Sequence, residues 1–212
     1  NALDFAQRQY MELRGQELEL QLELRQLNGG VAILDSGIWS WALTAIGTIG
    51  VLPKLVSMAP GDDNFVSPLV APPVLIAPSG SLNDYQGNDF ARDWLAAYVA
   101  SGGTLIVLTQ YENEDWKLLP GGEVEGIGYK DDIFCKDASV HIVNPSYWIT
   151  GIERDYPDIQ IDGSFTHWPS NATIIWQRRT GNEMPAMLEY SYGQGMVVAT
   201  AAYPDPNNAP VY

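Results

Sequence analysis

The sequence predicts an α/β fold whose sheet is mostly parallel, with an antiparallel section toward the C-terminus. Short, continuous apolar runs of the buried-strand type alternate with helical segments in the first half, which is typical of parallel sheets covered on both faces. Tight glycine-containing turns separate the last apolar runs, and such short connections favour antiparallel pairing. The 212 residues are 46% apolar, enough for a sizeable core.

The elements of the first half follow in order along the chain. Residues 31–35 form the first predicted strand, and 38–48 the helix after it, with Trp39, Leu43 and Ile46 at helical spacing. Further strands are expected at 52–58, 74–77 and 104–108. A second helix runs from its cap at Asn88 to Ser101 and ends at a Gly102-Gly103 pair. Its expected inward stripe consists of Phe90, Trp94, Ala97 and Tyr98.

The second half is less regular. Residues 111–137 contain eight acidic residues and few apolar runs, so a long loop region is expected there. A strand is expected at 139–143, followed by irregular chain from 145 to 172. Strands at 173–177, 186–192 and 196–201 complete the sheet, with turns at 180–182 and 193–195.

Residues 1–29 are expected to form an N-terminal arm, or the end of a preceding domain, before an α/β domain at 30–212. Leu3, Ala6, Tyr10 and Leu13 have helical spacing. Leucines then alternate at 18, 20, 22 and 24, which favours a strand, although Leu, Glu and Gln are good helix formers. Two placements stay open: packing on a domain of the same polypeptide, or strand addition to another protomer.

Composition excludes several classes of function. Eleven basic against 26 acidic residues give a net charge of −15, which repels nucleic-acid phosphates. One cysteine excludes an intrachain disulfide framework and a multi-cysteine zinc site, and no apolar run reaches 18 residues, so no membrane insertion is expected. Acidity and scarce lysine suit an extracytoplasmic or extracellular setting or a high-salt one, and the extracytoplasmic or extracellular setting is the prediction. The ends of the chain indicate a processed product or part of a longer surface protein.

Several segments resemble a known superfamily. The stretch Leu75-Ile-Ala-Pro-Ser-Gly80, followed by a helix that ends at Gly102-Gly103-Thr-Leu-Ile-Val107, is similar to the central βαβ unit of the class I glutamine amidotransferase-like superfamily. Pro185-Ala-Met-Leu188 and Tyr192-Gly-Gln-Gly-Met-Val-Val-Ala199 resemble the closing hairpin of its non-amidotransferase branches, which include trehalose-utilisation-type proteins and the middle domain of some β-galactosidases. The resemblance covers about residues 31–203 and implies a flavodoxin-like three-layer sandwich.

The catalytic residue of that superfamily is missing at the matching position. In catalytic members, the strand that corresponds to 104–108 runs into a sharp turn with a nucleophilic cysteine and small neighbours. Here the turn reads Thr109-Gln110-Tyr111, without Cys, Ser or glycine. The resemblance therefore implies a non-catalytic branch. A weaker alternative is a hydrolase that uses Cys135 with His141 six residues later.

A ligand cleft is the second expectation. Parallel sheets bind ligands at the carboxyl ends of their strands. The candidates there, with one histidine from a polar and aromatic loop, are Asp35, Ser36, Ser79, Gln110, Tyr111, Glu112 and His167. Such a polar cleft with an aromatic wall suits a sugar. Acidic groups at 62–64, 131–132 and 205–208 offer the hard oxygen ligands that Ca²⁺ prefers. No cofactor is expected, although a structural Ca²⁺ in the acidic 111–137 loop is a hypothesis.

The sequence thus favours a non-catalytic structural module that assembles domains or copies of a larger surface protein. Its arm would contribute Leu18, Leu20, Leu22 and Leu24. The alternative is a carbohydrate-binding or carbohydrate-active accessory domain that uses the cleft.

Overall fold

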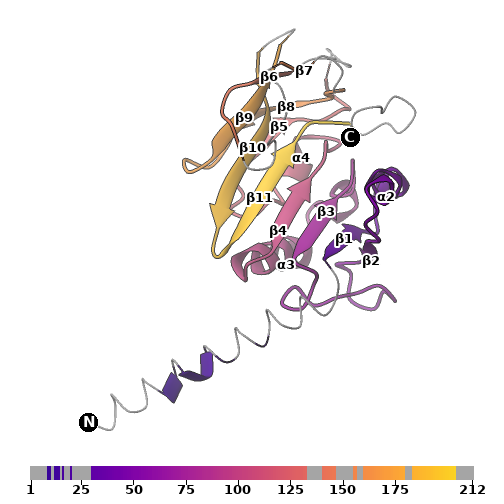
Figure 1. Ribbon diagram of the computed structural model, residues 1–212, viewed down its shortest axis with the longest axis vertical. Helices are drawn as coiled ribbons and strands as arrows, with labels where there is room; N and C mark the ends of the chain where they lie inside the picture. The colour runs from indigo at the N-terminus through magenta and orange to yellow at the C-terminus, as the bar shows by residue number, and fades with distance from the viewer. Residues whose placement is uncertain are drawn as a thin grey trace.

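The computed structural model describes residues 9–10, 12–14, 16, 20, 30–132, 140–146, 155–156, 160–179 and 183–203. A large twisted sheet forms its centre (Figure 1). The strand order is β2-β1-β3-β4-β11-β10-β9-β6-β7, and a separate ribbon pairs β5 with β8. The elements are β1 (Val31–Leu34), α2 (Trp39–Thr48), β2 (Lys54–Val56), β3 (Val74–Ala77), η1 (Asn83–Tyr85), α3 (Asp89–Ala100), β4 (Thr104–Val107), α4 (Asn113–Trp116), β5 (Glu125–Ile127), β6 (Val140–Ile142), β7 (Asp155–Tyr156), β8 (Ser164–His167), β9 (Thr173–Arg178), β10 (Pro185–Tyr192) and β11 (Gly195–Thr200).

The pairing confirms the predicted fold class. Strands β2, β1, β3, β4 and β11 are mutually parallel. Beyond β11, the strands β10, β9, β6 and β7 pair antiparallel. The hairpin of β10 and β11 turns at Gly193, whose φ of 60° favours glycine, as the sequence predicts.

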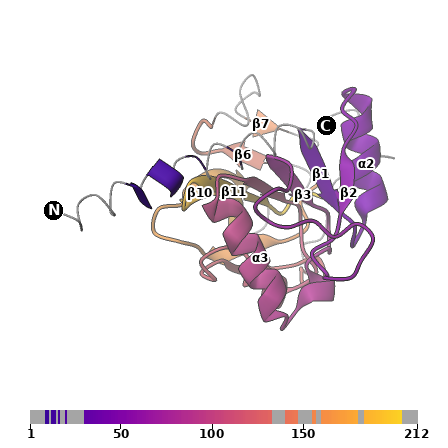
Figure 2. The same ribbon diagram turned by 90° about the horizontal axis from the view of Figure 1, so that it is seen from below.

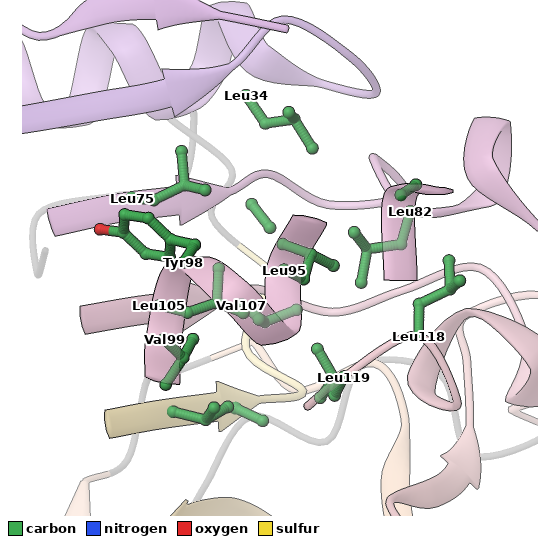
Figure 3. Packing of buried hydrophobic residues seen from close by; sticks show 14 of the residues in the cluster. Leu34, Leu75, Leu82, Leu95, Tyr98, Val99, Leu105, Val107, Leu118 and Leu119 are labelled. Carbon is green, nitrogen blue, oxygen red and sulfur yellow. The ribbon is translucent and has the colours of Figure 1, made fainter. Parts of the chain in front are cut away.

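Helices cover both faces of the parallel half and give the chain three layers (Figure 2). Leu34, Leu75 and Leu105 of the sheet point toward α3, where they meet Leu95 and Tyr98 (Figure 3). The opposite face contacts α2 through a smaller cluster that contains Ile33, Ala42 and Ile76. The cluster on the α3 face is the larger of these two, and each fully buried leucine in it contributes about 1.5–3 kcal/mol through burial. The α3 face therefore contributes more to stability than the α2 face.

Helix α3 begins and ends as its sequence predicts, but its buried stripe is shifted. The side chain of Asn88 accepts a hydrogen bond from the Ala91 N–H at 3.2 Å. Phe90 is 46% exposed, contrary to the prediction. The buried residues are Ala91, Trp94, Leu95, Tyr98 and Val99, because this set brings more apolar surface to the sheet than one centred on Phe90.

The acidic segment expected to be a loop contains helix α4 and strand β5. Helix α4 starts at a capping box: the Glu112 side chain accepts a hydrogen bond from the backbone N–H of Asp115, and the Asp115 side chain accepts one from the backbone N–H of Glu112. Strand β5 pairs with β8, which lies in the stretch predicted to be irregular. Both strands lack an apolar run, so only their mutual pairing and tertiary contacts define them.

In the N-terminal arm, the structure confirms the predicted helix at Tyr10 and Leu13, and the strand prediction for 18–24 is wrong at Leu20, the one position of that stretch that is described. Tyr10, Leu13 and Leu20 are helical and exposed. The described part of the arm lies away from the sheet (Figures 1 and 2). The physical reason is that alternation needs a neighbouring strand, while Leu, Glu and Gln favour helix when no such strand is available. Leu18, Leu22 and Leu24 lie outside the described residues.

Candidate functional site at the carboxyl edge of the parallel sheet

The carboxyl ends of β1, β3 and β4 meet at one edge, as a parallel sheet requires. The Ile38 N–H donates to the Ser79 carbonyl at 3.0 Å, and the Gly80 N–H donates to the Thr109 carbonyl at 3.0 Å. A Cβ on Gly37 would fall within 2.7 Å of the backbone at residues 79 and 81. The three strand ends are therefore joined directly, without space between them at this point.

Gln110 fills the position that follows β4. Its side chain is fully buried, and Nε2 donates to the carbonyls of Pro78 and Leu108, both at 2.9 Å. Its Oε1 accepts from the Leu82 N–H at 2.9 Å. Every polar atom of the amide is thus satisfied by backbone, and Gln110 serves as a structural bridge between the ends of β3 and β4.

Ser36 and Asp35 make separate contacts at the end of β1. The Ser36 hydroxyl lies 2.6 Å from Asp84 Oδ2 and 3.0 Å from the Ser81 carbonyl, both of which accept. Asp35 accepts from the side-chain amide of Asn64 at 2.9 Å. Both residues therefore stabilise loops around the edge.

An acidic network covers the beginning of α4. The buried carboxylate of Asp115 accepts from the Tyr111 and Glu112 N–H groups at 2.8 and 3.0 Å, and from Gln86 Nε2 at 2.8 Å. Glu112 accepts from Lys130 Nζ at 2.7 Å and from Gln86 at 2.8 Å. The hydrogen bonds from Lys130 and Gln86 hold the pKa of Glu112 below its ordinary value. Glu112 is therefore ionised and paired.

Four half-buried aromatic rings form a row beside this network: Trp41, Tyr203, Tyr129 and Tyr111. Successive centroids lie 5.5, 6.3 and 5.1 Å apart with edge-to-face geometry. Lys130 Nζ stands 5.0 Å from the centre of the Tyr111 ring. Burial, followed by the nearby Tyr203, raises the pKa of Tyr129, so its phenol is neutral. The row combines apolar ring surface with phenol groups.

Two buried hydroxyls at the end of β3 lack a hydrogen-bond partner. These are Ser79 Oγ and Ser81 Oγ, which flank Gly80. A Cβ on Gly80 would lie 2.6 Å from the Tyr129 hydroxyl, so that phenol sits directly against the same turn. The aromatic row thus adjoins polar groups that the protein leaves unsatisfied.

The structure brings together six of the seven predicted cleft residues, all but His167. His167 is exposed on β8, where it pairs with Glu125 of β5. The other end of β5 leads into Gly128, and that glycine is the one that lies against the backbone of Gln110 and Tyr111. His141 lies on β6 opposite Gln177, and Cys135 lies outside the described residues.

The described residues hold no group of three or more potential metal-ligating side chains. Of the acidic positions proposed for Ca²⁺, Asp132 is buried in an ion pair with Arg178 at 2.8 Å, and Asp62 accepts from the Ser57 hydroxyl. Positions 205–208 lie outside the described residues. No helix among the described residues has the length and apolar character needed to cross a membrane.

A pocket of about 410 Å³ lies elsewhere, lined by His141, Gln177, Arg178, Arg179 and Glu183. The buried Arg178 also donates to the Gly163 carbonyl at 3.2 Å, so its charge is used inside the fold.

Sequence reasoning missed Trp41, Tyr129, Lys130 and Tyr203 as parts of the edge. The segment 128–130 reaches it because the Tyr129 and Lys130 N–H groups donate to the carbonyls of Gln110 and Tyr111. The signal available in the sequence was the pattern Gly128-Tyr129-Lys130, in which glycine permits the approach that a Cβ would block at 2.2 Å.

No protein-family profile and no curated protein sequence matches this chain significantly. Solved structures do resemble it. A protein from Thermoplasma acidophilum, named for GMP synthase, is 13% identical with a TM-score of 0.57, over 82% of this chain and 83% of its own. A cytoplasmic protein from Salmonella typhimurium is 17% identical with a TM-score of 0.56, over 84% and 89%. A β-galactosidase from Rahnella sp. R3 is 15% identical with a TM-score of 0.53, over 84% of this chain but 29% of its own.

These neighbours agree with a glutamine amidotransferase-like, flavodoxin-type fold. At such identities the likeness concerns the fold alone.

Proposed function

We propose that this chain is a non-catalytic member of the amidotransferase-like fold, which acts as an assembly module of a larger surface or extracytoplasmic protein. The observation that carries the proposal is the burial of Gln110 at the position after β4. A nucleophile there would have to face substrate, whereas this amide is fully used by the backbone of residues 78, 82 and 108.

The surroundings support the same conclusion. The Thr109 hydroxyl is directed to the Asp162 carbonyl, and the nearby carboxylates of Glu112 and Asp115 are engaged by Gln86. None of these groups forms a nucleophile–base pair within the described residues.

Turnover assays test the absence of catalysis. The full chain, at high concentration, should hydrolyse neither glutamine nor a panel of aryl esters and aryl glycosides faster than buffer does. Turnover that disappears in Glu112→Gln, with the melting temperature retained, would overturn the proposal. The exposed Glu123→Gln variant serves as the matched control.

The aromatic row favours a second candidate function, carbohydrate binding. Sugars stack on aromatic rings and hydrogen-bond to phenols, and the half-buried Tyr111 and Tyr129 present both kinds of group side by side. A glycan array probed with the full chain would detect such binding, and the β-galactosidase neighbour makes galactose-terminated oligosaccharides the first probes.

Two variants separate this candidate from nonspecific adhesion. Tyr111→Ala should abolish glycan binding, while Phe90→Ala, which removes an exposed ring from α3, should not alter it. Binding that is absent, or equal in all three proteins, would eliminate the carbohydrate function.

A further inference from the structure

The turn between β8 and β9 contains the one N-linked glycosylation motif of the chain. Asn171-Ala172-Thr173 has the form Asn-x-Thr with a middle residue other than proline. One other asparagine has a hydroxyl residue two positions later, in Asn144-Pro145-Ser146, and the proline there excludes it as an acceptor. The sequence therefore offers a single acceptor together with a negative control.

The turn presents both functional side chains of the motif to solvent. The Ala172 N–H donates to the Pro169 carbonyl at 2.9 Å, which closes a β-turn with Asn171 at its third position. Asn171 and Thr173 are exposed, whereas Ala172 between them is half-buried and packs against the main core cluster. The amide and the hydroxyl therefore face solvent together, as a transferase that recognises both groups requires.

The hydrogen bonding of Asn171 is compatible with a glycan on its amide. Nδ2 donates to the Ser191 carbonyl at 3.0 Å, which uses one of its two N–H groups. In the transfer, Nδ2 bonds to the anomeric carbon of a lipid-linked oligosaccharide and loses one proton to a base of the transferase. The bond from that carbon to phosphate breaks, and the lipid diphosphate leaves with the electron pair. The N–H that remains can still donate to Ser191, so the turn keeps its contact with β10.

The motif lies at the edge of the sheet opposite the aromatic row. Strands β9 and β10 are antiparallel, β10 and β11 are antiparallel, and β11 is parallel to β4. Strand β9 therefore runs in the same direction as the parallel strands. Because Thr173 begins β9, the turn before it lies at the amino ends of those strands. A glycan at this turn leaves the carboxyl edge, with Gln110 and Tyr111, uncovered.

We propose that Asn171 carries an N-linked oligosaccharide. The inference rests on the extracytoplasmic placement in the proposed function, because this motif is modified in proteins that leave the cytoplasm. It adds a modification site to the assembly module and names the chemical class of the donor, a lipid-linked oligosaccharide.

Mass spectrometry of the protein isolated from its own cells tests the proposal directly. The peptide that contains Asn171 should carry the added mass of an oligosaccharide, and fragmentation should place that mass on residue 171. An Asn171 that is entirely unmodified in this protein would overturn the inference.

Variants of the full chain, secreted from a glycosylating host, test the motif residue by residue. The wild type should gain one glycan, Asn171→Gln and Thr173→Ala should lose it completely, and Thr173→Ser should keep it at lower occupancy. Asn144→Gln, which changes the exposed asparagine of the proline-blocked motif, is the matched control and should leave the glycan in place. The purified, folded chain, incubated with an oligosaccharyltransferase and a lipid-linked oligosaccharide, gives the same comparison without secretion.

Failure of this inference is distinguishable from failure of the proposed function. A wild type that gains no glycan, or a glycan that survives Asn171→Gln, removes the assignment of Asn171 alone, since neither the Gln110 bridge nor assembly depends on a glycan. Turnover of glutamine, esters or glycosides would remove the non-catalytic function and leave a glycan mapped to Asn171 standing.

Discussion

Replacing Gln110 by alanine should strongly destabilise the domain. The substitution removes three hydrogen bonds of 2.9 Å and leaves the Leu82 N–H and the Leu108 carbonyl without this partner, while the Pro78 carbonyl still accepts from the Ser81 N–H at 3.0 Å. Each buried group left unsatisfied costs about 1–3 kcal/mol. With the space left by the side chain, the loss should be about 3–5 kcal/mol of the free energy of unfolding.

Urea denaturation followed by far-ultraviolet circular dichroism measures this loss. The midpoint should fall while the slope with denaturant stays constant, because the folded and unfolded states keep their exposed surface. Gln194→Ala, which removes an exposed glutamine from the β10–β11 turn, is the matched control and should change stability by less than about 0.5 kcal/mol.

Gln110→Glu adds a pH test at nearly constant volume. The new carboxyl would face the carbonyls of Pro78 and Leu108, so it is tolerated only when protonated, and its folded pKa should be raised. The stability of this variant should be greatest below the unfolded pKa of the new carboxyl and should fall as pH rises through its folded pKa.

The alanine variant gives the result that would refute the reasoning. A loss of stability below about 1 kcal/mol in Gln110→Ala would refute the bridging role and reopen this position as a ligand group.

Three further outcomes are expected. Asp132→Asn should cost about 3–5 kcal/mol in chemical denaturation, because it removes the carboxylate charge that lies 2.8 Å from the fully buried Arg178 guanidinium; an unchanged midpoint would contradict this. Lys130→Ala should move the pKa of Glu112 upward in a carboxylate NMR titration, since the hydrogen bond from Lys130 is the main cause of the lowered Glu112 pKa. In the wild type, the stability that the Glu112 carboxylate adds is present above the unfolded pKa of Glu112 and should be lost as pH falls through its folded pKa. Gly47→Ala should stabilise the protein by about 0.5–1 kcal/mol in thermal melts, because this helical glycine has open space around its Cβ position.

The parallel core could be predicted because its signals are local. Residues 31–34, 74–77 and 104–107 are continuous apolar runs, and a strand buried on both faces needs no other pattern. The cap at Asn88 and the glycine pair after Ser101 also act within a few residues, so both ends of α3 follow from the sequence.

The arm and the β5–β8 ribbon could not be predicted in the same way. Leucine alternation from 18 to 24 satisfies a strand only if another strand lies alongside, and the described residues of the arm have none. Strands β5 and β8 show the opposite case, because Gly126 and Phe165 pair across 39 residues of sequence without any apolar pattern in β5.

The sequence by itself determined the fold class, the parallel strands and the lack of Cys, Ser or Gly at 109–111, since these depend on residue type and short-range spacing. Only the tertiary structure decided what the carboxyl edge contains. Gln110 became a buried bridge because residues 78 and 82 lie within hydrogen-bonding distance of it. Tyr129 joined the edge because its backbone pairs with the chain after β4. Both results depend on contacts between distant segments, which no local pattern encodes.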